Sequence, residues 1–573
     1  MKAKLIRMFF MIMTVTLIVG TLIACSNTKE TTTNNNDTPT ENNDDATKED
    51  SKKGGSITIA HASEPGNLNP LIWATATDVL VTRMVFDTIV VPDEELNLEG
   101  SLAKEWDLSD DGKTYTFYLH ENVKWHDGQP FTAKDVEFTF TSLAHPEYDM
   151  GANWRVNEIV GADSYRNGEA DSIEGINVIN DYTISFTTKE PFAPFLSSLY
   201  IGILPKHILG DVSPGDWAKH EFNRAPVGTG PFQFEKWETG QYMQFKANEE
   251  YFAGAPYLDR IITRFGDQNT MLAAFIGKEI DIAPVPITEL SSVENVPHAN
   301  LALANQLSVF YVGFNSRNKH FNDVKVRHAI AHAINKGAIN STILNDLGHE
   351  ADSVFPSKHW SYNPNLPQYN YNPSKAEELL EEAGYKKNAR GIYEKDGNEL
   401  TFYLETPTGT VERERTAVLL QQDLSAVGIN MEIRSLDFAT LVTKLLPKTQ
   451  DGRQREVTED DYDAYILGYG VTADPDEYRT YFGSAYMPPN GYNFVGYSNP
   501  EVDKLLEDQK EEVDFDKRQQ LIWKTAEILA EDLIWIPLYE QPNTFVANDK
   551  VGGFEPDFRG PTFNARKWYV KEN

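Results

Sequence analysis

The chain has 573 residues, a formal net charge of −34 at pH 7 and a single cysteine. This acidic excess argues against nucleic acid as a partner, because nucleic-acid binding needs a basic surface. If that cysteine carries lipid, no thiol is left for a disulfide, so the fold must depend on its hydrophobic core.

The chain begins with a segment typical of bacterial export signals. Basic residues precede the apolar run Met8–Ile23, whose roughly 16 residues are fewer than the roughly 20 that a membrane-spanning helix needs. The run ends in Leu22–Cys25, which resembles the lipobox of bacterial lipoproteins. That resemblance implies that residues 1–24 are a signal peptide and that Cys25 becomes the lipidated first residue of the mature chain. The alternative role for Cys25 is an intermolecular disulfide.

A polar segment follows the lipidated cysteine. Ser26–Lys53 consists mainly of Asn, Thr, Asp, Glu and Lys and contains no aromatic residue. Such a segment cannot bury enough apolar surface to offset its ordering entropy, so residues 25–53 are predicted to be a lipidated, disordered tether. As a flexible coil it would reach roughly 30 Å from the membrane. The protein is therefore expected outside the cytoplasm, anchored to the membrane by lipid.

Four segments in the first half alternate apolar and polar residues as strands do. They are Ser56–Ala60, Lys113–Leu119, Asp181–Phe186 and Gln241–Ala247. The turn residues that separate them are typical of β-structure.

The second half alternates helices with strands. A capping box that starts at Ser374 predicts a helix over Lys375–Ala383, which Gly384 would end. A second helix is predicted over Val411–Val427, ending at Gly428, and is followed by a strand over Ile429–Ile433. A third helix is predicted over Glu501–Glu511, with Asn499 as its N-cap and Pro500 at its first position. The pattern predicts an α/β chain whose sheets have covered faces.

Several motifs occur in a fixed order along residues 55–573. They are Leu102–Trp106, Val123–Val136, Ile203–Ile208, Pro226–Phe232, Asn248–Asp259, Gly313–Asn315, Val326–Ile330, Asp474–Asp476 and Ile536–Tyr539. Together they resemble the large solute-binding proteins of bacterial peptide ABC importers. Within that family the chain is most similar to the oligopeptide-binding lipoproteins of Gram-positive bacteria.

The resemblance implies a two-lobed periplasmic-binding-protein-like (Venus-flytrap) fold of the α/β class, with two crossings between the lobes. The expected boundaries are 55–98, 216–308 and 536–573 for lobe I, 99–215 for an extra subdomain of lobe I, and 309–535 for lobe II. The implied function is a membrane-anchored extracellular receptor, a monomer without cofactor, that closes on oligopeptides. It would deliver them to an ABC permease of two membrane subunits and two cytoplasmic ATPases.

A receptor for many peptides should bind the backbone and ammonium group and ignore the side chains. The resemblance points to Asp474 as the carboxylate for the ammonium, a charge-assisted bond that contributes roughly 1.5–3 kcal/mol. The alternative is a turn in which Asp474 only caps a helix. Tyr469 is expected either to form a wall of the cleft or to be a core aromatic. The other ligand-binding candidates are Trp73, Asn315, Tyr492 and Asn493.

The most recognisable motif, which lies in the expected subdomain, is interpreted as structural. Asp127 and Gly128 form a turn signal, and Trp125 and Trp106 are expected to serve packing rather than ligand binding.

No catalytic or metal motif stands out. His328 and His332 are four residues apart on a predicted helix, but no glutamate lies between them to act as a general base. The sequence from Asp107 begins like an EF-hand loop, but its twelfth position is Tyr118. We therefore expect no enzyme and no metal site. The alternatives are the same receptor fold with another cargo, such as a nickel chelate, haem, an opine or an oligosaccharide, or a sensor of peptide pheromones.

Overall fold

The structure, a computed structural model, describes residues 52–72 and 75–572. The predicted signal peptide, Cys25 and nearly all of the tether lie outside the described residues, as does Trp73. The described residues belong to one compact unit, 51–573. Within them, no helix combines the length and apolar character that crossing a membrane requires.

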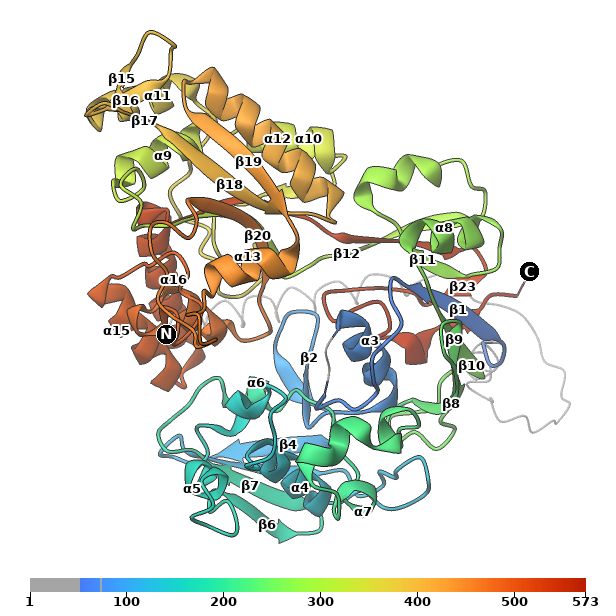
Figure 1. Cartoon of the computed structure of the whole chain (residues 1–573). Coiled ribbons are helices and arrows are strands. Elements are labelled where there is room, and N and C mark those ends of the chain that lie inside the picture. Colours follow the sequence, from blue (N-terminus) through green and yellow to red (C-terminus); the bar gives the residue numbers. More distant parts are fainter. Residues whose placement is uncertain (1–51, 73–74, 573) are drawn as a thin grey trace, which may run out of the picture. The chain divides into compact units, whose positions relative to one another are not determined.

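A seven-stranded sheet forms the centre of lobe I (Figure 1). Its strands are β1 (Ser56–His61), β8 (Phe232–Glu238), β9 (Tyr242–Ala247), β10 (Arg260–Phe265), β11 (Ile282–Pro284), β12 (Ala299–Ala304) and β22 (Asn543–Asn548), in the order β12-β22-β11-β1-β10-β9-β8. β1 pairs in parallel with β10 and β11, and its Ile57 and Ile59 are fully buried. The predicted strands Ser56–Ala60 and Gln241–Ala247 are confirmed as β1 and β9.

A six-stranded sheet forms the centre of lobe II. Its strands are β13 (Ser308–Phe314), β14 (His349–Glu350), β18 (Thr401–Pro407), β19 (Asn430–Leu436), β20 (Ala464–Gly470) and β21 (Trp535–Glu540), in the order β14-β21-β13-β20-β18-β19. The predicted strand Ile429–Ile433 is confirmed as β19 and extends to Leu436. A three-stranded sheet of β15 (Lys386–Lys387), β16 (Tyr393–Lys395) and β17 (Asn398–Glu399) adds to this lobe.

The chain crosses between the two large sheets twice. It passes from β12 in the first sheet to β13 in the second, and it returns between β21 and β22. Because β21 pairs with β13 in the second sheet, the return follows Glu540. The predicted boundary between residues 535 and 536 is therefore wrong by about one strand, since Ile536–Tyr539 was assigned to lobe I.

The extra subdomain is built on a four-stranded antiparallel sheet. The strands are β4 (Ala103–Leu108), β5 (Thr114–Leu119), β6 (Ile176–Asn180) and β7 (Thr183–Thr187), in the order β4-β5-β7-β6. The predicted strand Asp181–Phe186 corresponds to β7, but it starts two residues too early, because Asp181 lies in the turn between β6 and β7. Two small two-stranded sheets complete the strands, β2 (Val90–Pro92) with β3 (Leu98–Gly100) and β23 (Val551–Gly552) with β24 (Tyr569–Val570).

The motif Val123–Val136 contributes to core packing and forms a turn, in agreement with the structural role predicted for it. Trp125 is 2% exposed in the core, and Gly128 has a φ of +90°, which suits the turn that follows Asp127. The carboxylate of Asp127 accepts a hydrogen bond from the backbone N–H of Gln129 at 3.2 Å and lies 2.8 Å from Nε2 of His207.

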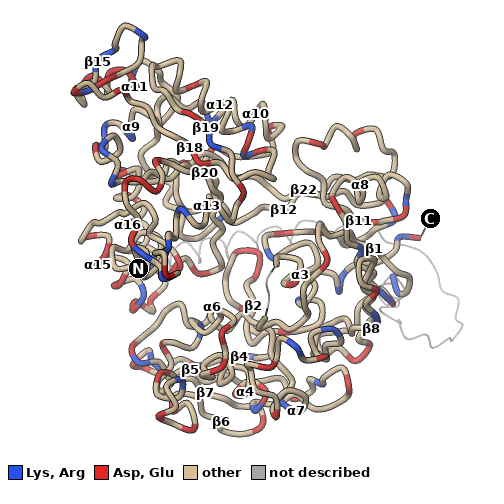
Figure 2. Tube along the Cα trace, viewed as in Figure 1, with Lys and Arg blue, Asp and Glu red and all other residues tan. Residues whose placement is uncertain are grey.

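The helices of the described residues cover these sheets. They are α3 (Ala76–Val85), α4 (Ala133–Leu143), α5 (Ala162–Arg166), α6 (Phe195–Ser198), α7 (Lys206–Leu209), α8 (Gln268–Ile276), α9 (Val324–Ala333), α10 (Lys336–Ile343), α11 (Pro373–Glu382), α12 (Val411–Ala426), α13 (Phe438–Leu445), α14 (Arg479–Phe482), α15 (Pro500–Glu511) and α16 (Phe515–Asp532). Figure 1 shows α12 beside β18 and β19, which it contacts, and α13 also contacts β18. Figure 2 shows acidic residues along elements of both lobes and the subdomain.

The ends of three predicted helices can be compared with the structure. α12 ends before Gly428, which has a φ of +87°, and Asn499 caps α15 with Pro500 at its first position, both as predicted. The capping box at Ser374 is wrong. Asn372 caps α11 instead, and Pro373 opens it, because the Asn372 side chain accepts the backbone N–H of Lys375.

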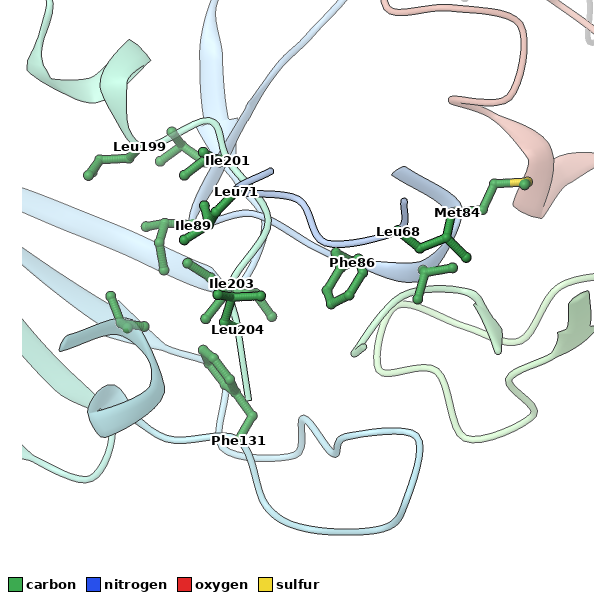
Figure 3. Packing of buried hydrophobic residues seen from close by; sticks show 14 of the residues in the cluster. Leu68, Leu71, Met84, Phe86, Ile89, Phe131, Leu199, Ile201, Ile203 and Leu204 are labelled. Carbon is green, nitrogen blue, oxygen red and sulfur yellow. The ribbon is translucent and has the colours of Figure 1, made fainter. Parts of the chain in front are cut away.

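A hydrophobic cluster joins α3 to the subdomain. Figure 3 shows Leu68, Leu71, Met84, Phe86, Ile89, Phe131, Leu199, Ile201, Ile203 and Leu204 packed together, and each is at most 6% exposed. Burying one such side chain contributes roughly 1.5–3 kcal/mol. The cluster therefore fixes the last turn of α3 against the chain segment 199–204.

The glycine motif Gly228–Gly230 lies directly on the end of α3. The N–H of Gly230 donates to the carbonyl oxygen of Val85 at 2.8 Å. His126 bridges the same loop, because its Nδ1 accepts from the N–H of Gly228 at 3.2 Å and its Nε2 lies 2.9 Å from the carbonyl oxygen of Gly230. These two bonds require a neutral imidazole with its proton on Nε2.

Acidification should weaken this loop through His126. Burial lowers the pKa of His126 to about 4, against 6.5 in an unfolded chain. The folded state therefore binds fewer protons between these two values, and the contribution is present above pH 6.5 and lost as the pH falls toward 4. Between pH 7 and pH 4.5 we expect about 2 kcal/mol of unfolding free energy to be lost through this residue.

Denaturant unfolding of the parent and of His126→Gln at both pH values measures this contribution. The variant should be less stable at pH 7 and should lose less on acidification than the parent. The exposed His349 provides the matched control, because His349→Gln should lose as much as the parent. Equal losses in all three proteins would contradict the prediction.

Candidate functional site

A cavity of about 300 Å³ lies between the two lobes. One wall comes from α3 and from the segment Tyr200–Gly202, the other from Val471–Ala473, which directly follows β20 of lobe II. Phe86 and Ile201, two members of the cluster in Figure 3, line it as well. Because the cavity is bounded by both lobes, its shape depends on how far they close.

A second cavity of about 550 Å³ adjoins the first within lobe I. The two share Arg83, Phe86, Thr88, Tyr200 and Arg559 in their linings. The larger cavity extends under the β2–β3 hairpin and is lined by charges of both signs.

The subdomain touches lobe II directly. The N–H of Ala193 donates to the carbonyl oxygen of Lys510, in α15, at 2.9 Å. Tyr115 of β5 lies near the Asp474–Arg518 pair of lobe II, whose charges act on it, while burial raises its pKa to about 12. Lobe II is thus linked to lobe I by the two crossings of the chain and to the subdomain by these contacts.

Asp474 is held by an internal partner. Its two carboxylate oxygens accept hydrogen bonds from Nη1 and Nη2 of Arg518 at 2.5 and 2.7 Å, and the pair is buried. Oδ1 also accepts the N–H of Asp476 at 2.9 Å, which makes Asp474 the N-cap of the short helix Pro475–Tyr478. The predicted turn with an N-cap accounts for these contacts. The ammonium role of Asp474 stays a prediction.

The tyrosines predicted to line the cleft form one stack. Tyr469, 9% exposed, packs on Tyr481 with ring centroids 4.4 Å apart, and Tyr481 stacks on Tyr492 at 5.5 Å. Burial raises the pKa of Tyr469 well above its usual value. Tyr492 is 45% exposed and is the solvent-facing end of the stack.

Asn315 and Asn493 are fully buried and serve the backbone of lobe II. Nδ2 of Asn315 donates to the carbonyl oxygens of Thr458 and Tyr462, both at 2.9 Å. Nδ2 of Asn493 donates to Gly483 at 3.0 Å and its Oδ1 accepts the N–H of Tyr497 at 3.0 Å. Neither side chain has an exposed amide to offer a ligand in this conformation, and their ligand role also stays a prediction.

Three cavity residues carry chemistry that sequence reasoning missed. Arg83, Arg155 and Tyr200 line the cavity between the lobes. None belongs to a recognisable motif, and no local pattern marks them as neighbours. The only sequence signal is that two cations occur in apolar surroundings of a strongly acidic chain.

Among the described residues, no group of three or more His, Cys, Asp or Glu side chains could hold a metal ion. Nε2 of His328 lies 2.7 Å from the carbonyl oxygen of Glu531, and Nδ1 of His332 lies 2.8 Å from the carbonyl oxygen of Asn370.

Comparison with known proteins identifies the family. A family model described as bacterial extracellular solute-binding proteins, family 5 Middle, matches residues 97–488. The oligopeptide-binding protein AppA of Bacillus subtilis is 30% identical over 526 residues, which cover 91% of this chain and 92% of that protein. The chain therefore belongs to family 5 of the bacterial extracellular solute-binding proteins.

Solved structures agree with this assignment. AppA from Bacillus subtilis in complex with a nonapeptide has a TM-score of 0.72 at 30% identity, over 91% of this chain and 100% of that one. NikZ from Campylobacter jejuni in complex with Ni(L-His) has a TM-score of 0.74 at 27% identity, over 90% and 99%. The predicted two-lobed fold and the resemblance to peptide-importer receptors are confirmed.

Proposed function

We propose that this chain is an extracellular receptor that captures oligopeptides between its lobes and delivers them to an ABC permease. The observation that carries the proposal is the cavity bounded by α3 and by the segment after β20, in a chain similar along nine-tenths of its length to a protein solved with a nonapeptide. Lobe closure around a peptide excludes water and strengthens its backbone hydrogen bonds.

The remaining features of the proposal come from the chain's start and its family. We propose a lipid anchor on Cys25 that holds the receptor on the outer face of the cell membrane, most simply on a Gram-positive cell surface. The receptor acts as a monomer, without cofactor and without catalysis of its own. Its macromolecular partners are the permease subunits that carry the cytoplasmic ATPases.

Mass spectrometry of the molecules that co-purify with the protein tests the proposed cargo. Peptides of mixed sequence should be released on denaturation, and the emptied protein should bind them again in calorimetry. A single metal chelate, haem or sugar, with no binding of peptides, would contradict the proposal and favour the solute of NikZ-like relatives or another cargo.

The tyrosine stack provides a more local test. We expect Tyr492→Ala to weaken peptide binding about three- to tenfold, because an exposed aromatic ring that packs on a ligand contributes roughly 0.5–1.5 kcal/mol beyond its buried area. Tyr371, also 45% exposed in lobe II, is the matched control, and Tyr371→Ala should leave affinity unchanged. Equal affinities of both variants and the parent in calorimetry would remove Tyr492 from the site.

A further inference from the structure

Two arginines line the cavity between the lobes without an acidic partner. Arg83 lies in α3, and Arg155 lies in the short helix Asn153–Val156 of the subdomain. Among the described residues, no carboxylate oxygen lies within 4.0 Å of either guanidinium group. The chain has 86 acidic and 52 basic residues, so acidic partners are abundant. Leaving two arginines unpaired at one cavity is therefore a specific feature of this place.

Arg155 keeps one edge of its guanidinium group free. Its Nη1 donates to the carbonyl oxygens of Ser198 at 2.8 Å and Ser197 at 3.5 Å. Its Nε is buried and has no hydrogen-bond partner, and Nη2 makes no hydrogen bond within the described residues. The Nε–Nη2 edge is one that binds a carboxylate through two parallel hydrogen bonds.

Arg155 also remains a cation in this setting. Burial lowers its pKa to about 10, which leaves it protonated at neutral pH. A charge withdrawn from water without a counter-ion carries a large desolvation penalty. A bound anion would offset that penalty.

Tyr200 lies next to both arginines. The guanidinium carbon of Arg83 is 5.3 Å from the centre of the Tyr200 ring, and Nη1 of Arg83 donates to the carbonyl oxygen of Arg559. The hydroxyl of Tyr200 is buried and has no hydrogen-bond partner. The same cavity thus holds two cations and an unused hydroxyl donor.

Glu477 of lobe II is the acidic group whose charge acts on Arg155. Burial raises the pKa of Glu477, and the positive charge of Arg155 acts in the opposite direction. The two form no ion pair within 4.0 Å. Glu477 therefore faces the arginine from the other lobe without neutralising it.

We propose that Arg83, Arg155 and the Tyr200 hydroxyl form a carboxylate-binding subsite in the cavity between the lobes. This rests on the proposed function and adds to it the chemistry of the ligand. The carboxylate comes either from the end of the bound peptide or from an Asp or Glu side chain within it. In a receptor of net charge −34, such a subsite offsets the repulsion that an anionic peptide would otherwise meet.

The test uses one neutral nonapeptide sequence in three forms. The first has a free carboxyl terminus, the second is amidated, and the third is amidated but contains one glutamate. Calorimetry with the mature protein should show that the parent binds one or both carboxylate forms at least tenfold more tightly than the neutral amide. The first form reports the terminal carboxylate and the third reports the side chain.

Arg83→Gln and Arg155→Gln should each remove most of that preference, measured in each variant as the ratio of its affinities for the carboxylate forms and for the neutral amide. The exposed Arg415 in α12 is the charge-matched control, and Arg415→Gln should retain the preference. Equal binding of all three forms by the parent would overturn the subsite and leave the peptide receptor intact. Binding of none of them would overturn the proposed function, and the subsite with it.

Discussion

Replacing Arg518 with methionine should lower the free energy of unfolding by about 3–5 kcal/mol, because removing one partner leaves a buried charge uncompensated. Arg518 is 5% exposed and Asp474 is 8% exposed, and two hydrogen bonds join them. Arg518 also donates through Nε to Gln509, which ties α16 to the end of α15. Chemical denaturation followed by intrinsic fluorescence measures the change.

An exposed ion pair provides the control for the effect of removing one positive charge. Arg453 is 82% exposed and pairs with Asp451 at 2.7 Å, so Arg453→Met should change stability by less than about 1 kcal/mol. A double variant, Arg518→Met with Asp474→Asn, should recover part of the stability, since it removes both charges. A loss below 1 kcal/mol in Arg518→Met would show that the buried pair is not a structural element.

The same pair decides between the two roles predicted for Asp474. As a structural partner, Asp474→Asn should lower stability and affect free-amino and acetylated peptides alike. As the partner of a peptide ammonium, it should weaken binding of free-amino peptides only. Calorimetry with the two peptide forms, next to the unfolding measurement, separates these outcomes.

Replacing Gly228 with alanine should destabilise the protein by about 3 kcal/mol or more, at the upper end of overpacking effects. A Cβ atom at this position would overlap the carbonyl oxygen of Val85, which is backbone and cannot move aside as a flexible side chain can. At Gly230 a Cβ atom would lie 2.6 Å from the carbonyl carbon of the same residue. The motif thus needs glycine for close approach to α3.

Peptide affinity should fall together with stability in Gly228→Ala, because displacement of the end of α3 moves Arg83 and Phe86 in the cavity wall. Gly277, at the end of α8, is the control. A Cβ atom there would meet its nearest neighbour, the carbonyl oxygen of Ala273, at an ordinary 3.4 Å, so Gly277→Ala should be nearly neutral. Unchanged stability of Gly228→Ala would refute the close-packing account of this motif.

Local elements could be predicted from the sequence because local interactions determine them. Alternation predicted β1 and β9, and Asn499 with Pro500 predicted the start of α15. The capping box at Ser374 failed because the helix starts earlier, with Asn372 as its N-cap and Pro373 at its first position, both of which favour a helix start. The boundary at residue 536 failed for a different reason, since Ile536–Tyr539 reads equally well as a strand of either sheet and only its pairing with β13 assigns it.

The candidate site was less accessible to sequence reasoning. The family motifs identified Asp474 as a ligand candidate, but its partner Arg518 lies 44 residues further along the chain. Arg83 and Arg155 carry no motif. The cluster of Figure 3 holds α3, which carries Arg83, against the segment 199–204, and Arg155 donates to the carbonyl oxygens of Ser197 and Ser198 just before that segment. Whether a polar side chain is free for a ligand depends on partners that are distant in sequence.

The sequence by itself determined the acidic charge and most of the local elements, because each of these follows from composition or from neighbours within a few turns, and the resemblance of its motifs indicated the family. Only the tertiary structure decided which charged groups are satisfied internally and which remain open at the cavity. The physical reason is that burial and ion pairing are set by long-range packing, which brings together residues that no local pattern relates.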